Sequence, residues 1–168
     1  MPHPAPENSL SDLLQENPHS PVWAVDLTRQ QIHRHLGNGN WDSAPVSTSR
    51  FGIGSEPDSN KTPVGWHQIV KVIGVGGPTD QEYISREPVP ASTREDRILS
   101  RILWLDGLEP GVNRTSRDRY IYIHGTNHTD LLGTPESMGC VRMDPDTIAD
   151  WADQCGDAKP KVWIGELG

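Results

Sequence analysis

The sequence predicts a mainly β protein, folded as a sandwich or barrel with a few short helices. Glycine and proline together account for 31 of the 168 residues, and both destabilise the interior of a helix. Short stretches of alternating apolar and polar residues are separated by turn-forming residues, as is typical of the strands of an all-β domain. There is no internal repeat, and a chain of 168 residues has room for one hydrophobic core.

Residues 1–21 are predicted to form an extension that precedes a single domain, residues 22–168. The extension is rich in proline at both ends, but its centre carries helix signals. Ser9 and Asp12 have the spacing of a capping box, and leucines at positions 10, 13 and 14 follow helical spacing. We therefore expect one short helix here, packed against the main domain.

Seven short strands are predicted in the main domain, because apolar and polar residues alternate or because valine, isoleucine and tyrosine are concentrated. They cover residues 22–28, 31–36, 46–51, 66–72, 98–105, 120–124 and 161–164. Residues 28–30 are the expected turn between the first two strands, and residues 52–61, rich in Gly, Pro, Asp, Asn and Ser, are an expected loop. Residues 74–97 form a polar excursion without periodicity, for which a lid over the cleft is one interpretation.

A second helix is predicted near the C-terminus. Asp144 is a good N-cap residue, and Pro145 is suited to the first helical position. Apolar residues at positions 148, 151 and 152 follow with helical spacing, and Gly156 ends the pattern.

Charge and apolar content exclude two classes of partner. The formal net charge is −8, with 15 basic and 23 acidic residues, which argues against binding to nucleic acid. The longest apolar run, residues 102–105, is far shorter than the ~18 residues of a membrane-spanning helix. The N-terminus has neither the basic nor the apolar region of a signal peptide. We therefore expect a cytoplasmic protein, or a periplasmic or cell-wall protein if the chain has been trimmed.

The residues that can carry chemistry are concentrated around His124 and Cys140. The histidine ends a predicted strand, and the cysteine follows sixteen residues later, behind Gly139 and just before the C-terminal helix. A cysteine thiolate can act as a nucleophile while an imidazole accepts its proton. Gly139 permits a tight turn, which would let nearby backbone amides form an oxyanion hole. A single cysteine is more often a small core residue, which is the role expected for Cys155.

Two other interpretations of the motifs are weaker. His124 and His128 have the i, i+4 spacing of a helical metal pair, with Cys140 as a third zinc ligand. The intervening Gly-Thr-Asn is poor helix sequence, so the two imidazoles need not share a face. The glycine-rich stretch 74–78 fits no phosphate-binding motif, and its proline would remove an amide from such a loop.

The region from His124 to Arg142 resembles the signature of the L,D-transpeptidase catalytic domain (YkuD) family. His124-Gly125-Thr126 is followed by a short polar loop with Gly133 and by Ser137-Met138-Gly139-Cys140-Val141-Arg142. Upstream, residues 46–49 and Thr62-Pro63-Val64-Gly65-Trp66 are similar to a strand and a Thr-Pro-x-Gly segment of the family. The resemblance covers about residues 22–165 and implies a β-sandwich with a short helix near the cysteine.

The resemblance also implies roles for individual residues. Cys140 is the nucleophile, and His124 is its base, oriented by the carbonyl of Gly125. Backbone amides at Met138, Gly139 and Cys140 hold the oxyanion, and Arg142 fixes either a substrate carboxylate or the loop itself. The expected substrate-binding set is completed by Ser137, Met138, Thr126 and Trp66. Many relatives have a second histidine where this chain has Met138, so any role of that histidine is absent or filled elsewhere.

The reaction that the resemblance implies is acyl transfer on the stem peptides of bacterial peptidoglycan, without metal or organic cofactor. The thiolate would expel the terminal D-alanine of a tetrapeptide and leave a thioester. We expect hydrolysis of that thioester, an L,D-carboxypeptidase activity in the recycling of soluble muropeptides. Transpeptidation, which forms cross-links or exchanges D-amino acids, is the alternative, and a binding module without turnover is a further one. The sequence leaves the oligomeric state open.

Overall fold

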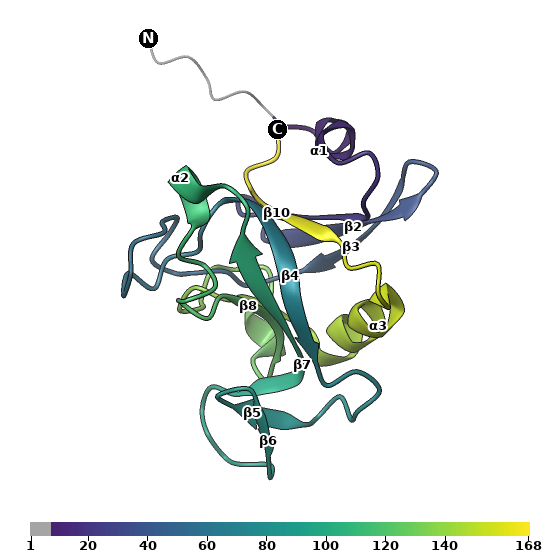
Figure 1. Cartoon of the computed structure of the whole chain (residues 1–168). Coiled ribbons are helices and arrows are strands. Elements are labelled where there is room, and N and C mark those ends of the chain that lie inside the picture. The colour runs from purple at the N-terminus through teal and green to yellow at the C-terminus, as the bar shows by residue number, and fades with distance from the viewer. Residues whose placement is uncertain (1–7) are drawn as a thin grey trace.

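One curved mixed sheet holds the ten strands found in residues 8–168, the part of the chain that the computed structural model describes (Figure 1). The strands are β1 (Val22–Asp26), β2 (Gln31–Gly37), β3 (Asn40–Pro45), β4 (Gly65–Ile73), β5 (Glu82–Ile84), β6 (Glu87–Val89), β7 (Ile98–Gly107), β8 (Tyr122–Thr126), β9 (Val141–Met143) and β10 (Lys161–Gly165). The helices are α1 (Leu10–Glu16), α2 (Pro110–Asn113) and α3 (Pro145–Cys155), with a 3-10 turn, η1, at Thr129–Leu131. The expectation of a mainly β fold with a few short helices is confirmed.

The sheet curls so that its two ends meet near β9. Its main path runs β3-β2-β1-β10-β4-β7, and β7 then pairs with β8, which pairs with β9. The pairs β1–β10 and β8–β9 are parallel, and the other pairs are antiparallel. Beyond β3 the chain returns to the opposite end, where Ser47 bridges to Arg142 and Ser49 to Ser137. Two segments that are distant in sequence therefore meet beside Cys140.

The main hydrophobic core lies inside this curve and is covered on one side by α3. Asp144 caps α3 by accepting hydrogen bonds from the N–H groups of Asp146 and Thr147, as its position before Pro145 predicts. Trp151 of α3 packs edge-to-face on Trp23 of β1, with ring centroids 5.5 Å apart. The predicted C-terminal helix is thus confirmed.

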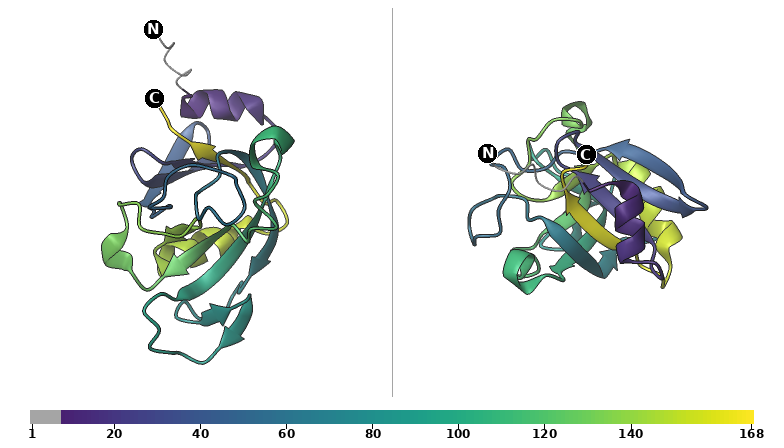
Figure 2. Two further views of the ribbon diagram at one scale, coloured as in Figure 1. Left: turned by 90° about the vertical axis from the view of Figure 1, so that its left-hand side faces the viewer. Right: turned by 90° about the horizontal axis from the view of Figure 1, so that it is seen from above.

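A second apolar cluster joins α1 to the outer face of β1 and β10. Leu13 is buried there against Val22, Ala24 and Trp163. Ser9 and Asp12 form the predicted capping box. Figure 2 shows α1 lying across the end of the sheet near the C-terminus, where Asn8 bridges to Leu167. None of the helices described is long and apolar enough to cross a membrane.

The strand predicted at residues 46–51 is wrong, because the regular strand lies earlier, at β3. A tight turn with Asn38 and Gly39 both at positive φ connects β2 to β3, and Asn-Gly is the residue pair that such hairpin turns favour. Between Pro45 and β4 the chain makes only isolated bridges. Val46, Ser47, Thr48 and Ser49 are all buried although they form no regular strand.

The excursion 74–97 contains a hairpin, β5–β6, that the sequence does not predict. Its turn residues, Ser85 and Arg86, both have positive φ although neither is glycine. The Arg86 guanidinium lies over the rings of Trp104, 4.8 Å from the centroid, and of Tyr120, 5.0 Å from the centroid. It also donates to the hydroxyl of Tyr122 at 2.9 Å. These contacts compensate for the unfavourable backbone conformation of the turn.

The strand predicted at 120–124 begins two residues later, at Tyr122, and extends to Thr126. Tyr120 has a φ of 57°, which takes it out of the strand conformation. The shift places both His124 and Gly125 inside β8 rather than at its end.

Candidate active site

His124 lies on β8 opposite an irregularity in the neighbouring strand β7. Two residues of β7, Ser100 and Arg101, bulge out between the positions that pair with Gly125 and His124. Ser100 has a φ of 76°, so the backbone of β7 bends sharply at this point. Bulges of this kind change the direction of side chains next to active sites.

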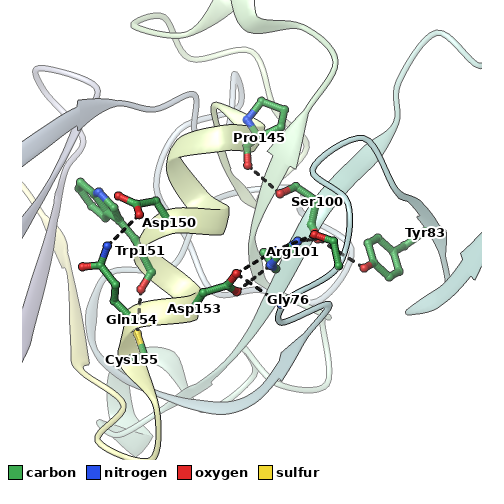
Figure 3. Close-up of polar contacts among 11 residues, drawn as sticks. Gly76, Tyr83, Ser100, Arg101, Pro145, Asp150, Trp151, Asp153, Gln154 and Cys155 are labelled. Atoms are coloured by element: carbon green, nitrogen blue, oxygen red, sulfur yellow. Dashed lines mark hydrogen bonds and ion pairs between the residues drawn. The ribbon is translucent and has the colours of Figure 1, made fainter.

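The bulge is held in place by α3 (Figure 3). Arg101, buried with 2% of its side chain exposed, donates through Nε and Nη2 to the two carboxylate oxygens of Asp153, both at 2.9 Å. The hydroxyl of Ser100 donates to the carbonyl of Pro145 at 2.6 Å. A bidentate pair is among the stronger polar contacts in proteins, so α3 fixes the backbone beside His124.

His124 is buried and has one ring nitrogen committed to its own strand. Its Nδ1 lies 2.7 Å from the carbonyl oxygen of Gly125, so Nδ1 carries the proton and Nε2 stays free to accept one. Burial, assisted by the charge of Arg142, lowers the pKa of His124 to about 4, although the bond to Gly125 opposes the shift. The imidazole is therefore neutral at neutral pH, as a general base must be.

Glycine is required at position 125 because the backbone of two neighbours comes close. A Cβ at this position would collide with the carbonyl oxygen of Leu99 and lie 3.2 Å from Cα of Pro145. The approach of β7 and α3 thus depends on the residue that follows His124.

Cys140 stands just before β9, in a loop that hydrogen bonds hold on both sides. The backbone N–H of Tyr122 donates to Sγ at 3.4 Å, and the thiol faces the carbonyl of Tyr120 at 3.5 Å. Thr62 donates through its hydroxyl to the carbonyl of Gly139 at 2.9 Å. Gly139 has a φ of 124°, and a Cβ there would lie 3.3 Å from the Lys61 carbonyl oxygen, so glycine suits this turn.

The register of β8 and β9 brings the cysteine and the histidine to one face of the sheet. His124 pairs with Arg142, and Ile123 pairs with Val141. Ile123 and Val141 are fully buried in the main core. Because side chains alternate along a strand, His124 and Arg142 face the opposite side, the side on which Tyr122 contacts the Cys140 thiol.

The Cys140 thiol is not ionised in advance. Burial raises its pKa, whereas the Tyr122 N–H and the charges of Arg142 and Arg119 act in the opposite direction. A thiol that reacts from its neutral form has to lose its proton during nucleophilic attack.

The Ser137 hydroxyl organises the loop rather than facing solvent. It donates to the carbonyl of Cys140 at 2.6 Å and accepts from the N–H of Gly139 at 3.2 Å. Fewer of the backbone amides expected to bind the oxyanion are therefore free to donate in this conformation. The Gly139 amide is occupied, while the amides of Met138 and Cys140 have no acceptor within residues 8–168.

A pocket of about 400 Å³ opens beside Cys140. The 52–61 loop, the segment before β8 and the cysteine loop form its wall. The lining residues are Pro57, Asp58, Asn60, Thr115, Asp118, Arg119, Tyr120, Ile121, Met138 and Cys140. Of the substrate-binding residues that the sequence predicts, Met138 lies here, with 45% of its surface exposed.

The other expected substrate-binding residues lie outside that lining. Arg142 is buried in an ion pair with Asp96 of the excursion, Nη2 to Oδ2 at 2.7 Å. Thr126 is fully buried and accepts from the N–H of His128. Trp66 lines a separate pocket of about 500 Å³ together with Trp163.

The helical metal pair considered for His124 and His128 has no helix on which to lie. His124 is on β8, and His128 is the residue before the 3-10 turn η1. In residues 8–168 no cluster of three His, Cys, Asp or Glu side chains is positioned to hold a metal ion.

The sequence pattern missed three residues that the structure brings to the site. Asp96 contacts Arg142, Tyr122 contacts the thiol, and Arg119 lines the pocket. No motif in the sequence points to these contacts, because they join segments that are distant along the chain.

The fold is a curved β-sheet domain in which the register of β8 and β9 places His124 and Cys140 on one face. The model of the L,D-transpeptidase catalytic domain family, YkuD, matches residues 20–164. The chain belongs to this family, as its sequence motifs predict. No curated protein matches the sequence.

Solved structures with the same fold include several L,D-transpeptidases. One from Mycobacterium smegmatis is 16% identical with a TM-score of 0.53, and the match covers 87% of this chain and 58% of that one. L,D-transpeptidase 3 from Mycobacterium tuberculosis, in complex with a faropenem-derived adduct, is 16% identical with a TM-score of 0.53, over 88% and 60% of the two chains. The helical cell shape determining protein Pgp2 from Campylobacter jejuni is 16% identical with a TM-score of 0.54, over 89% and 48%. This chain thus spans about half to three-fifths of the length of these structures.

Proposed function

We propose that the protein is a cysteine acyltransferase of peptidoglycan stem peptides that uses water as acceptor, an L,D-carboxypeptidase. The observation that carries the proposal is the common face of β8 and β9. There, His124 has its Nδ1 fixed by Gly125, and the Cys140 thiol borders a pocket. Family membership and the L,D-transpeptidases of the same fold support stem peptides as the substrate class.

In the proposed mechanism Cys140 attacks the carbonyl that precedes the terminal D-alanine. The thiol proton passes to Nε2 of His124, while Nδ1 keeps its own proton and donates it in a hydrogen bond to the Gly125 carbonyl. The amides of Met138 and Cys140 stabilise the oxyanion of the tetrahedral intermediate. Collapse of the intermediate breaks the C–N bond, and His124 returns the proton to the leaving amine. Water, deprotonated by His124, then attacks the thioester and regenerates the thiol.

The size of the pocket supports water as the acceptor. About 400 Å³ is at the small end of the ~300–1,000 Å³ range of ligand sites, so it suits one peptide end. Cys140 itself is partly exposed, so a thioester formed there is open to water. Transfer to a second amine uses the same thioester, and a module that binds muropeptides without turnover would use the same pocket.

Incubation with a disaccharide tetrapeptide, with and without excess D-methionine, tests this proposal by mass analysis of the products. We expect mainly the tripeptide in both reactions. If exchanged tetrapeptide or cross-linked dimer dominates, the protein is a transpeptidase. If the tetrapeptide is bound but unchanged, the protein is a binding module.

A further inference from the structure

The two arginines whose charges act on Cys140 differ in their partners. Arg142 is neutralised by Asp96 and lies outside the lining of the pocket. Arg119 lines the pocket and is held by uncharged acceptors, the carbonyls of Gly54 and Lys61 and the hydroxyl of Ser59. No carboxylate in residues 8–168 forms an ion pair with it.

We propose that Arg119, and not Arg142, binds the carboxylate of the substrate in the pocket beside Cys140. The inference rests on the proposed function, in which a terminal D-alanine carries a carboxylate one residue beyond the carbonyl that Cys140 attacks. It assigns to that anion the arginine that lines the pocket and has no anionic partner in the described chain.

The hydrogen bonds of Arg119 leave it able to bind an anion. A guanidinium has five N–H donors, and the three contacts of Arg119 use three of them. These contacts fix its orientation before a ligand arrives, which reduces the entropy lost on binding. The donors left over are Nε–H and one Nη1–H, because both N–H groups of Nη2 are used, and partial burial strengthens a charge-assisted contact from either of them to a carboxylate.

Two acidic residues in the same pocket restrict the ligand further. Asp58 and Asp118 line the pocket together with Arg119. Their carboxylates attract an amine, so a ligand that carries both an amine and a carboxylate would meet both charges. The pocket therefore favours a zwitterionic peptide end, such as a diamino acid followed by a free carboxyl-terminal residue.

A purely structural role for Arg119 makes a different prediction. The carbonyls that it binds belong to the 52–61 loop, and the Lys61 carbonyl lies against the Gly139 turn. Loss of that support would alter the reactivity of Cys140 toward every reagent equally. Loss of an anion site would alter reactivity toward anionic reagents selectively.

Alkylation of Cys140 separates the two roles. In a Cys155→Ser background, the rate with iodoacetate is divided by the rate with iodoacetamide, which has the same leaving group but no charge. The ionisation and exposure of the thiol affect both rates equally, so they cancel in the ratio. We expect Arg119→Gln to lower the ratio by about tenfold, as loss of a charge-assisted contact implies.

Two matched variants and a salt titration complete the test. Arg117→Gln removes the same charge two residues away, outside the pocket lining, and is expected to leave the ratio unchanged. Arg119→Lys keeps the positive charge and should keep part of the preference for iodoacetate over iodoacetamide. If Arg119→Gln does not fold, the wild-type ratio still decides, because an anion site requires it to fall as ionic strength rises. A ratio that is independent of Arg119 or of salt would overturn the proposal.

A substrate pair extends the test to turnover. A tetrapeptide with a free carboxyl terminus and its carboxyl-terminal amide are compared in wild type and Arg119→Gln. We expect the variant to raise KM for the acid by about tenfold and to change KM for the amide little. Equal losses for both peptides would refute the carboxylate role. Absence of turnover in wild type would count against the proposed function alone, because the alkylation ratio needs no turnover.

Discussion

The two sides of the site are held by different kinds of contact. On the histidine side, regular strand pairing, a buried bulge and the Arg101–Asp153 pair fix His124. On the pocket side, loops are held by side chains that bond to backbone. Thr62 holds the Gly139 carbonyl, and Arg119 holds the 52–61 loop.

This difference separates the proposed base from the part of the site that would select the ligand. The position of His124 is part of the fold, so changes that disturb it also cost stability. The pocket depends on a few side-chain contacts between loops, so its preference for a ligand can change while His124 stays in place. Sites on regular elements hold geometry more tightly than sites on loops.

The largest expected effect is loss of the nucleophile. Cys140→Ala is expected to abolish product formation, because no other thiol borders the pocket. Cys155→Ser should keep turnover within a few-fold, since Cys155 lies at the end of α3, where its thiol meets the Trp151 carbonyl. Tripeptide release measured by mass spectrometry checks both, and full activity in Cys140→Ala would rule out the mechanism.

Replacement of the base comes next. His124→Gln is expected to lower kcat/KM by about 10²–10⁴-fold, the usual contribution of a general base. In wild type the neutral base is lost only as the pH falls toward about 4, the pKa of His124, so the acid limb of the kcat/KM profile should lie there. An acid limb near pH 6.5 would contradict the burial of the imidazole.

The Arg101–Asp153 ion pair on the histidine side is expected to contribute to the stability of the protein. Asp153→Ala leaves the Arg101 guanidinium buried without its anion, and we expect a loss of about 3 kcal/mol in the free energy of unfolding. Asp42→Ala removes the partner of Arg34 in a more exposed pair and should cost less than ~1 kcal/mol. Denaturant titration of both variants measures the difference. Equal losses would mean that the Arg101–Asp153 pair stabilises the fold no more than the exposed pair does.

Local signals in the sequence predict the parts of the fold that depend on local chemistry. The cap at Asp144, the helix that follows it and six of the seven strands are governed by near neighbours, and these are confirmed. The register that places His124 beside Arg142 depends on pairing between distant strands, and the resemblance to the family is what suggests their proximity.

The missed features depend on contacts that sequence spacing does not encode. Asn38-Gly39 was an available signal for the β2–β3 turn, whereas Ser85-Arg86 is an unusual turn pair that depends on Trp104 and Tyr122. The partner of Arg142 could not be predicted either, because Asp96 lies in a segment without periodicity.

Acid is expected to destabilise the fold through two buried histidines, His67 on β4 and His124 on β8. Burial lowers the pKa of His124 and of His67 from 6.5 to about 4, so the unfolded chain binds more protons between these values. Stability should be complete above pH 6.5 and fall by about 2 kcal/mol per histidine by pH 5. In a stable His67→Asn variant, the loss of stability between pH 6.5 and pH 5 should be about half as large. Stability that stays flat from pH 7 to 5 would contradict the shifts.

The smallest expected effect concerns the excursion that reaches Arg142. Asp96 is 53% exposed whereas Arg142 is 7% exposed, so the carboxylate is screened by solvent and the pair should add less than ~1 kcal/mol to stability. Asp96→Asn is therefore expected to change kcat/KM only a few-fold.

The pH profile gives that variant a more specific signature. The charge of Asp96 raises the pKa of His124, while Arg142 lowers it. Removing the carboxylate disfavours the imidazolium, so the acid limb of kcat/KM should move to lower pH in Asp96→Asn. Asp42→Asn, which breaks the Arg34 pair instead, should leave the limb in place. A shift to higher pH, or an equal shift in both variants, would show that Asp96 does not act on the base. Asp96 belongs to the excursion, whereas His124 belongs to the sheet. A shift of the expected sign would therefore establish that the excursion alters the pKa of His124 without fixing its position.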